Sequence, residues 1–313
     1  MSVLSAEQTQ GSKRRRNLKM ADRRAGFGLL APAGIVMLAV TIFPIVYSII
    51  MSFNNINLTT NGFEFQSNGI NNYKTVFGSP VFWHSAWFTV YYAIVTVFVE
   101  LFFGLLIALA INNVKKLQGL SISIMLIPWA LITVISAQMW DYIYNGVYGV
   151  LNAVAAGLHL IGQPVTWLGQ NTSAVIAMMV ADIWKTTPFV VIILLSGLQM
   201  IAQDYYEAAR IDGANSWQLF WKVTFPLLRG SIALAGLFRI LQAFGVFDLP
   251  FVLTQGGPGT ATESLAILGY RTLFEDLHFG VGAAVAVSTV ILILLACLIF
   301  LSGFRSMVEE EAA

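Results

Sequence analysis

The chain alternates between long apolar segments and shorter polar ones. Six segments combine about 20 or more mainly apolar residues with few charges, which is what a helix needs to cross the hydrocarbon core of a bilayer. Helices are expected because lipid offers no hydrogen-bonding partners to backbone N–H and C=O groups. The sequence therefore predicts an all-α, polytopic membrane protein with six transmembrane helices, at residues 27–53, 86–111, 120–140, 173–200, 226–247 and 279–304.

The composition agrees with a membrane protein. Hydrophobic residues make up 57% of the 313 residues and charged residues only 11%, whereas a typical soluble domain is about 45–50% apolar and about 25% charged. So few charges cannot cover a water-exposed surface. The one cysteine, Cys297, lies inside an apolar run. No intrachain disulfide is therefore possible, and the thiol is expected to pack as a small hydrophobic group.

The distribution of Lys and Arg predicts the orientation, because cytoplasmic loops carry an excess of these residues. With the N-terminus in the cytoplasm, the outside receives only Lys74 and Arg271. The inside receives the basic tail 1–26, together with Lys115, Lys116, Arg210, Lys222, Arg229 and the tail residue Arg305. We therefore expect an N-in, C-in protein of the cell membrane, with cytoplasmic tails at 1–26 and 305–313.

The basic tail is interpreted as a topology signal rather than a nucleic-acid-binding segment. The first apolar run is longer than the roughly 7–15 residues of a signal-peptide core, so this run is expected to remain as a membrane anchor. Three polar segments are then predicted outside, at 54–85, 141–172 and 249–278. The second of these contains a candidate short amphipathic helix at 150–161.

The cytoplasmic segment 201–225 has the pattern of a helix, a break and a second helix. Asp204 is a candidate N-cap with Glu207 three residues later, which is the spacing of a capping box. Gly213 suits the positive φ that commonly ends a helix. Ser216 is a candidate cap for the next helix, and Pro226 fits the first turn of the fifth span.

Small residues make this segment a candidate docking element, because Ala208 and Ala209 allow another surface to approach closely. The alternative is a simple connector between two spans. A resemblance favours docking, since the segment resembles the EAA motif of ABC importer permeases. The residues that carry this resemblance are Glu207, Ala208, Ala209, Asp212, Gly213, Phe225 and Pro226.

The resemblance extends over most of the chain from the first span to the sixth. Pro128 in the third span, the run Trp-Lys-Thr-Thr-Pro-Phe at 184–189 and the run Thr-Gln-Gly-Gly-Pro at 254–258, with Thr262 and Glu263, resemble carbohydrate-uptake permeases. These are the permeases for maltose, trehalose and glycerol-phosphate. The resemblance implies the MetI-like permease fold and a di- or oligosaccharide substrate such as trehalose or maltose, with a glycerol-phosphate-type substrate as the alternative.

The resemblance also implies the partners. The family works as two permease subunits, two ATPase subunits and an external binding protein, in the inner or plasma membrane of bacteria. This chain contains no phosphate-binding G-x-x-x-x-G-K-[ST] loop, so ATP and Mg²⁺ would bind the ATPase partner, and the chain is expected to be neither an enzyme nor a cofactor protein. The coupling to the ATPase would use Glu207, Ala208, Ala209, Asp212, Gly213 and Pro226.

Placing an ionisable group inside the membrane costs free energy, so such groups mark candidate functional positions. Asp182 and Lys185 are three residues apart on the fourth span, a spacing that allows them to pair. The resemblance places sugar-contacting positions of maltose-type permeases on Ser136, Asp182, Lys185, Thr186, Phe189, Arg239, Gln242 and Val246. Arg239 and Val246 depart from the small polar groups that those permeases tend to have.

Two interpretations stay open for these positions. Arg239 either binds substrate hydroxyls or a phosphate, or pairs internally with Asp182. Phe189 either stacks on a sugar ring or packs within the protein. Glu100 stands alone in the second span, where it either hydrogen-bonds to another helix or approaches the interface, and no transport role is assigned to it.

Other classes of function find less support in the sequence. A secondary transporter would show inverted repeats and matched broken helices, which are not evident. A polytopic membrane enzyme would need a carboxylate pair or metal site at the membrane edge, and the adjacent acids Glu275 and Asp276 lack further ligands. His84, His159 and His278 do not have metal-ligand spacing. The EAA-like segment argues against these classes and against a plain scaffold.

Overall fold

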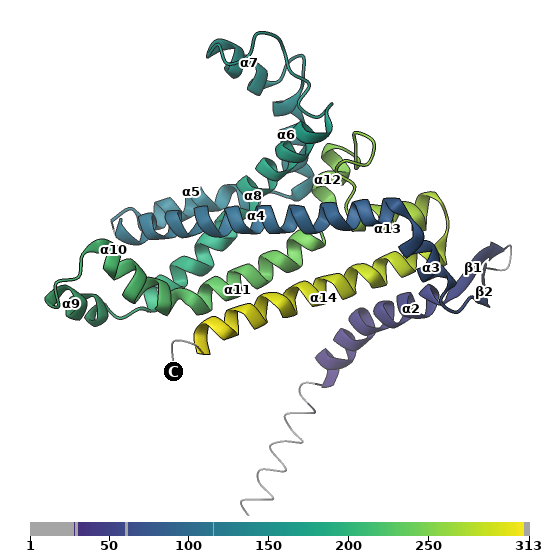
Figure 1. The fold of residues 1–313 in the computed structure, drawn as a ribbon, viewed down its shortest axis with the longest axis horizontal. Coiled ribbons are helices and arrows are strands. Elements are labelled where there is room, and N and C mark those ends of the chain that lie inside the picture. The colour runs from purple at the N-terminus through teal and green to yellow at the C-terminus, as the bar shows by residue number, and fades with distance from the viewer. Residues whose placement is uncertain (1–27, 29–30, 60–61, 115, 310–313) are drawn as a thin grey trace, which may run out of the picture. The chain divides into compact units, whose positions relative to one another are not determined.

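The structure is a computed structural model that describes residues 28, 31–59, 62–114 and 116–309 (Figure 1). The predicted tail 1–26, Lys115 and residues 310–313 lie outside the described residues, and so does the side chain of Arg305. The chain divides into two units, Met1–Met51 and Ser52–Ala313.

The first unit carries the first apolar segment, which forms one helix over Ala31–Ser52. This helix contains a π-helical turn, η1 (Leu38–Ile42), and continues as α2 (Phe43–Ser52). It has 22 residues. At 1.5 Å per residue it is long enough to cross the apolar part of a bilayer.

Four long helices form the bundle of the second unit (Figure 1). They are α4 (Pro80–Asn113), α8 (Asn171–Met200), α11 (Phe225–Phe244) and α14 (Phe279–Glu309). In the apolar 18-residue stretch of α8, 61% of the residues are buried, against 28–33% in the corresponding stretches of the other three helices. α8 is therefore the central helix, and the others keep wide apolar faces for contacts outside this chain. The helical membrane fold predicted from the apolar segments is confirmed.

Close approach of α4 and α8 depends on a small residue. A Cβ atom placed on Gly104 of α4 would lie 2.6 Å from Val190 Cγ1 of α8, closer than real Cβ atoms come. Val190 and Leu194 of α8 are fully buried next to Ala108 of α4. The absence of a side chain at Gly104 thus lets the two backbones pack tightly.

The third predicted span is two helices instead of one. α5 (Gln118–Ala130) and α6 (Thr133–Tyr144) meet at 88°. The bend lies at Leu131 and Ile132, whose backbones are both extended. Pro128 lies inside α5, three residues before the break, and a proline weakens the last turn because it has no N–H to donate.

The segment 201–225 contains the predicted helix, break and second helix, but two of its predicted caps are wrong. α9 (Gln203–Ile211) begins after Ala202, so Asp204 falls in its first turn, where a carboxylate still favours the positive end of the helix dipole. α10 (Ser216–Leu219) is capped by Asn215, which forms a reciprocal capping box with Gln218. The side chain of Asn215 accepts from the Gln218 N–H at 2.9 Å.

The end of α9 and the start of the fifth span follow the prediction more closely. Gly213 has φ +82°, a conformation that suits glycine. α10 continues through a π-helical turn, η2 (Phe220–Thr224), directly into α11, so that one helical run covers Ser216–Phe244. Pro226 lies in the first turn of α11, and the wider π turn before it accommodates the missing N–H.

At the opposite end of the bundle from α9, the chain forms a small β-hairpin (Figure 1). Strands β1 (Asn54–Thr59) and β2 (Gly62–Ser67) pair antiparallel, with Asn54 opposite Ser67. The buried side chain of Asn72, in α3 (Asn71–Gly78), donates to the backbone carbonyls of Ser52 and Asn54 at 2.9 Å. These bonds fix the base of the hairpin to α3.

Short helices complete the polar segments between the long ones. α7 (Val150–Gly157) occupies most of the segment 150–161, where a short helix was predicted. α12 (Asp248–Leu253), α13 (Leu265–Tyr270) and the π-helical turn η3 (Arg271–Glu275) lie between α11 and α14. Arg271 holds this region together, because it donates to Glu263 Oε1 at 2.7 Å and to the carbonyl of Gln255 at 2.6 Å.

Candidate functional site

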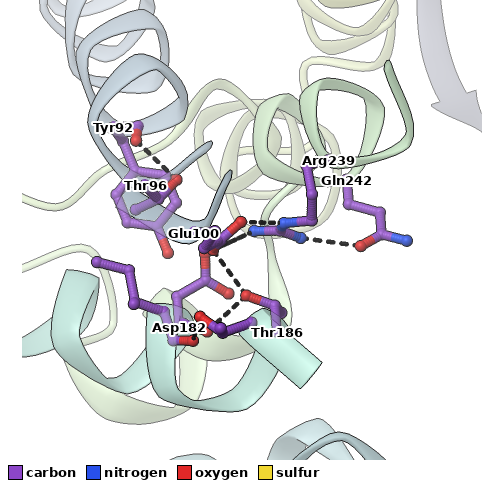
Figure 2. Close-up of polar contacts among 9 residues, drawn as sticks. Tyr92, Thr96, Glu100, Asp182, Thr186, Arg239 and Gln242 are labelled. Carbon is purple, nitrogen blue, oxygen red and sulfur yellow. Dashed lines mark hydrogen bonds and ion pairs between the residues drawn. The ribbon is translucent and has the colours of Figure 1, made fainter. Parts of the chain in front are cut away.

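Three helices bring opposite charges together in the interior of the bundle. Arg239 of α11, Glu100 of α4 and Asp182 of α8 are 2%, 0% and 7% exposed. Figure 2 shows the guanidinium beside Glu100 and Gln242. Arg239 Nε donates to Glu100 Oε2, and Nη2 donates to Glu100 Oε1 at 2.8 Å and to Asp182 Oδ2 at 3.2 Å. The guanidinium of Arg239 therefore binds both carboxylate oxygens of Glu100.

Polar neighbours complete the bonding of this cluster. Arg239 Nη1 donates to Gln242 Oε1 at 2.8 Å. The hydroxyl of Thr186 lies 2.7 Å from Glu100 Oε1 and 2.7 Å from the carbonyl of Asp182, one turn earlier on α8. Such partners are required, since an uncompensated buried charge costs several kcal/mol.

The internal pairing of Arg239 with Asp182, one of its two interpretations, is present in the structure. Asp182 and Lys185, whose spacing allows them to pair, have different partners, and Asp182 pairs with Arg239. Lys185 Nζ instead donates to the carbonyl of Leu131 at 2.8 Å. The bend between α5 and α6 leaves that carbonyl without a helical partner, and an ammonium group is favoured at the negative end of a helix.

A cavity of about 320 Å³ borders the charged cluster. Six of the eight predicted pathway residues line it, namely Asp182, Lys185, Thr186, Arg239, Gln242 and Val246. The same cavity is lined by Trp129 of α5 and Thr133 of α6, which lie on either side of the bend, and by Asp248 of α12. The cavity thus offers hydrogen-bond donors and acceptors beside the aromatic residues Trp129 and Phe247, which is a lining that a polyhydroxylated ring can use.

The other two predicted residues lie elsewhere. The ring of Phe189 stacks on Trp129 at 6.0 Å between ring centroids and meets Phe238 edge-on at 6.0 Å. This arrangement is the packing alternative. Ser136 of α6 is fully buried, and its hydroxyl has no hydrogen-bond partner among the described residues.

Glu100 is the site residue that sequence reasoning missed. No transport role was assigned to it; of its two alternatives, the structure confirms the hydrogen bond to another helix, through Arg239 of α11. A signal was present, because a single acid in an apolar span requires a basic partner, and Lys185 and Arg239 are the basic residues in the interior of the later predicted spans, with Arg229 at a span boundary. The choice between Lys185 and Arg239 needed the three-dimensional packing.

The predicted coupling residues gather around α9, which lies at one end of the bundle (Figure 1). Glu207 and Ala208 are exposed. Ala209, Asp212 and Gly213 line a hollow of about 260 Å³ between α9 and the next helix. Pro226 lies farther along, in α11. The hydroxyls of Tyr206 and Thr224 are 3.2 Å apart and connect α9 to η2, which leads into the span that carries Arg239.

Comparison with protein families identifies the family to which this chain belongs. Residues 75–309 match the model of the binding-protein-dependent transport system inner membrane component. The chain belongs to this family of permeases. It is therefore the membrane component of an ABC importer, and ATP hydrolysis is carried out by a separate ATPase.

Curated relatives of this permease include carbohydrate transporters. It is 38% identical over 289 residues to the trehalose/maltose transport system permease protein MalF of Thermococcus litoralis, covering 92% of this chain and 96% of the relative. It is 35% identical over 286 residues to the sulfoquinovosyl glycerol transport system permease protein SmoG of Agrobacterium fabrum, covering 91% and 92%.

A solved structure confirms the fold of this permease. A bacterial ABC transporter involved in the import of the acidic polysaccharide alginate contains a chain that superposes with a TM-score of 0.79. The sequence identity is 22%, and the match covers 93% of this chain and 99% of the other. This likeness supports the MetI-like permease fold that the sequence predicted.

Proposed function

We propose that this permease forms half of the translocation pathway of an ATP-driven importer for a di- or oligosaccharide such as trehalose or maltose. The observation that carries the proposal is the cavity beside Arg239, because six residues predicted to contact sugar line it together with Trp129. The 38% identical trehalose/maltose permease supports the choice of substrate. A glycerol-phosphate-type substrate is the alternative within the family.

The proposed complex contains a second permease subunit, two ATPase subunits that bind ATP and Mg²⁺, and an external sugar-binding protein. α9 would sit in a groove of the ATPase, with Glu207 and Ala208 on its exposed surface. Movement of α9 would reach the cavity through η2 and α11. The pathway would then alternate between inward-open and outward-open states that ATP and substrate bias.

The proposal is tested by purifying the complex through a tag on this chain. Its ATPase rate is then measured in lipid with the matching binding protein and a panel of sugars. We expect an ATPase to co-purify, and one sugar with its binding protein to raise the rate. A chain that purifies alone, from membranes that move solute without ATP, would instead identify a secondary transporter.

The coupling role is tested by Glu207→Lys. Charge reversal on the exposed face of α9 is expected to abolish stimulation of the ATPase, or to release the ATPase, because a charge-assisted contact becomes a repulsion. Asp276→Lys is the matched control, since it makes the same charge change at another exposed position. Sugar-stimulated ATPase activity and co-purification in the Glu207→Lys complex equal to those of the control would refute the role of Glu207.

A further inference from the structure

The guanidinium of Arg239 is almost fully engaged within the protein. Arginine has five N–H donors, and four of them have acceptors on Glu100, Asp182 and Gln242. Only one N–H of Nη1 is left to face the cavity. The side chain is 2% exposed, so its bonds to the two carboxylates are shielded from water and strong.

The charges around the cavity do not favour an anion. Its wall carries two cations, Lys185 and Arg239, and two carboxylates, Asp182 and Asp248. Glu100 is bound to Arg239 from behind this wall and adds a third carboxylate. Lys185 donates one of its three N–H groups to the carbonyl of Leu131. A negative substrate would therefore meet excess negative charge at this wall.

A neutral sugar meets no such barrier. Its hydroxyl groups can accept from the remaining Nη1 hydrogen of Arg239, bond to the amide of Gln242 or the hydroxyl of Thr186, and leave the buried ion pairs intact. The fold alone does not make this distinction, because the alginate transporter of similar fold imports an acidic polysaccharide. The discrimination must come from side chains.

We infer that Glu100 is a specificity-determining residue that neutralises Arg239, so that this wall of the pathway accepts neutral sugars and rejects anionic ones. Glu100 does not touch the substrate in this arrangement. It acts by holding the Arg239 guanidinium. The inference rests on the proposed function, since it requires the cavity to belong to the sugar pathway.

The test measures binding to the purified complete complex in lipid nanodiscs, without the external binding protein, so that the preference of that protein does not enter. Labelled trehalose and labelled maltose are displaced with unlabelled trehalose, with maltose or with trehalose 6-phosphate. The phosphate has the same sugar frame with added negative charge. In the wild type we expect displacement by a neutral disaccharide and little by the phosphate.

Glu100→Gln keeps the size and the hydrogen-bonding oxygen of the side chain but removes its charge. We expect trehalose 6-phosphate to compete at least about tenfold better relative to the neutral sugar, a change that corresponds to about 1.4 kcal/mol. Glu100→Asp keeps the charge and should keep the rejection. In the double variant Glu100→Gln with Arg239→Gln, the gain should disappear.

A second variant protects the test against misfolding of the first. Asp182→Asn removes the other carboxylate on Arg239 and should also improve competition by the phosphate. The inference is overturned if the wild type binds the phosphate as well as the neutral sugar, or if assembled Glu100→Gln and Asp182→Asn complexes keep the wild-type ratio. A wild type that binds no neutral disaccharide would overturn the proposed function itself.

Discussion

At the scale of single residues, Lys185 illustrates how one side chain supports a bend in a neighbouring span. Its ammonium group takes up the carbonyl of Leu131 at the bend between α5 and α6. The bend leaves this backbone carbonyl without a helical partner, and without Lys185 it would have no hydrogen bond at membrane depth. Non-helical backbone is tolerated at that depth only where protein or a cavity supplies partners. Lys185 supplies one.

Lys185→Met is therefore expected to destabilise the complex by about 1 kcal/mol, because it leaves a partly buried acceptor unsatisfied. Methionine has a similar length and no donor. The measurement is the midpoint of thermal unfolding of the purified complex. Lys74→Met, at an exposed lysine of α3, serves as control. Equal midpoints for the two variants would show that Lys185 does not support the bend.

At the scale of helices, the site depends on how closely α4 and α8 approach. Glu100 lies one turn before Gly104 on α4, and Asp182 and Thr186 lie on α8 before Val190. The contact between Gly104 and Val190 thus sets the separation across which Glu100, Thr186 and Asp182 meet. The packing of two apolar surfaces positions the polar cluster.

Gly104→Leu is expected to push α4 away from α8 and to lower stability by about 1–3 kcal/mol, the usual cost of overpacking. Because Glu100 moves with α4, the affinity for the neutral sugar should change as well. Thermal unfolding and sugar binding measure the two effects. Gly230→Leu in α11 is the control, since a Cβ there meets nothing within 4 Å. A Gly104→Leu complex as stable as this control would contradict the packing argument.

The elements also show why some features were predictable and others were not. The helical fold followed from the length of the apolar runs, because lipid enforces it. The bend at Leu131 was not predictable, since Leu131 and Ile132 are ordinary apolar residues and the carbonyl partner, Lys185, lies 54 residues away. The cap at Asn215 was assigned to Ser216, because both residues are good caps and only the backbone geometry selects one.

Some residues of the site were likewise predictable from the sequence, and others were not. Family resemblance located six residues of the cavity wall, since substrate positions follow the alignment of the helices. It did not locate Glu100, whose partner Arg239 is 139 residues away. The β-hairpin was also missed, because its alternating apolar positions, such as Ile56 and Phe65, occur in a short polar segment.

At the scale of the whole molecule, the unit Ser52–Ala313 has two different ends (Figure 1). α9 and the predicted ATPase-coupling residues lie at one end, and the β-hairpin with α3 lies at the other. The cavity residues lie between these ends, on α8, α11 and their neighbours. The coupling role proposed for α9 requires that this end face the cytoplasm, as the bias of Lys and Arg predicts.

The orientation is tested with single cysteines in a Cys297→Ser background. Asp276→Cys is expected to react with a membrane-impermeant maleimide in intact spheroplasts. Arg210→Cys is expected to react only after the membrane is opened. Both replaced side chains are exposed, so access depends on the side of the membrane. The reverse labelling pattern would contradict the N-in, C-in topology.

The ion pair of Glu100 and Arg239 has a consequence for how the protein is made. The chain is synthesised from its N-terminus, so Glu100 reaches the bilayer well before the ribosome has translated Arg239. During that interval the carboxylate has no counter-charge, and a lone charge in hydrocarbon is expensive. The ion pair can therefore form only after α11 has joined the earlier helices.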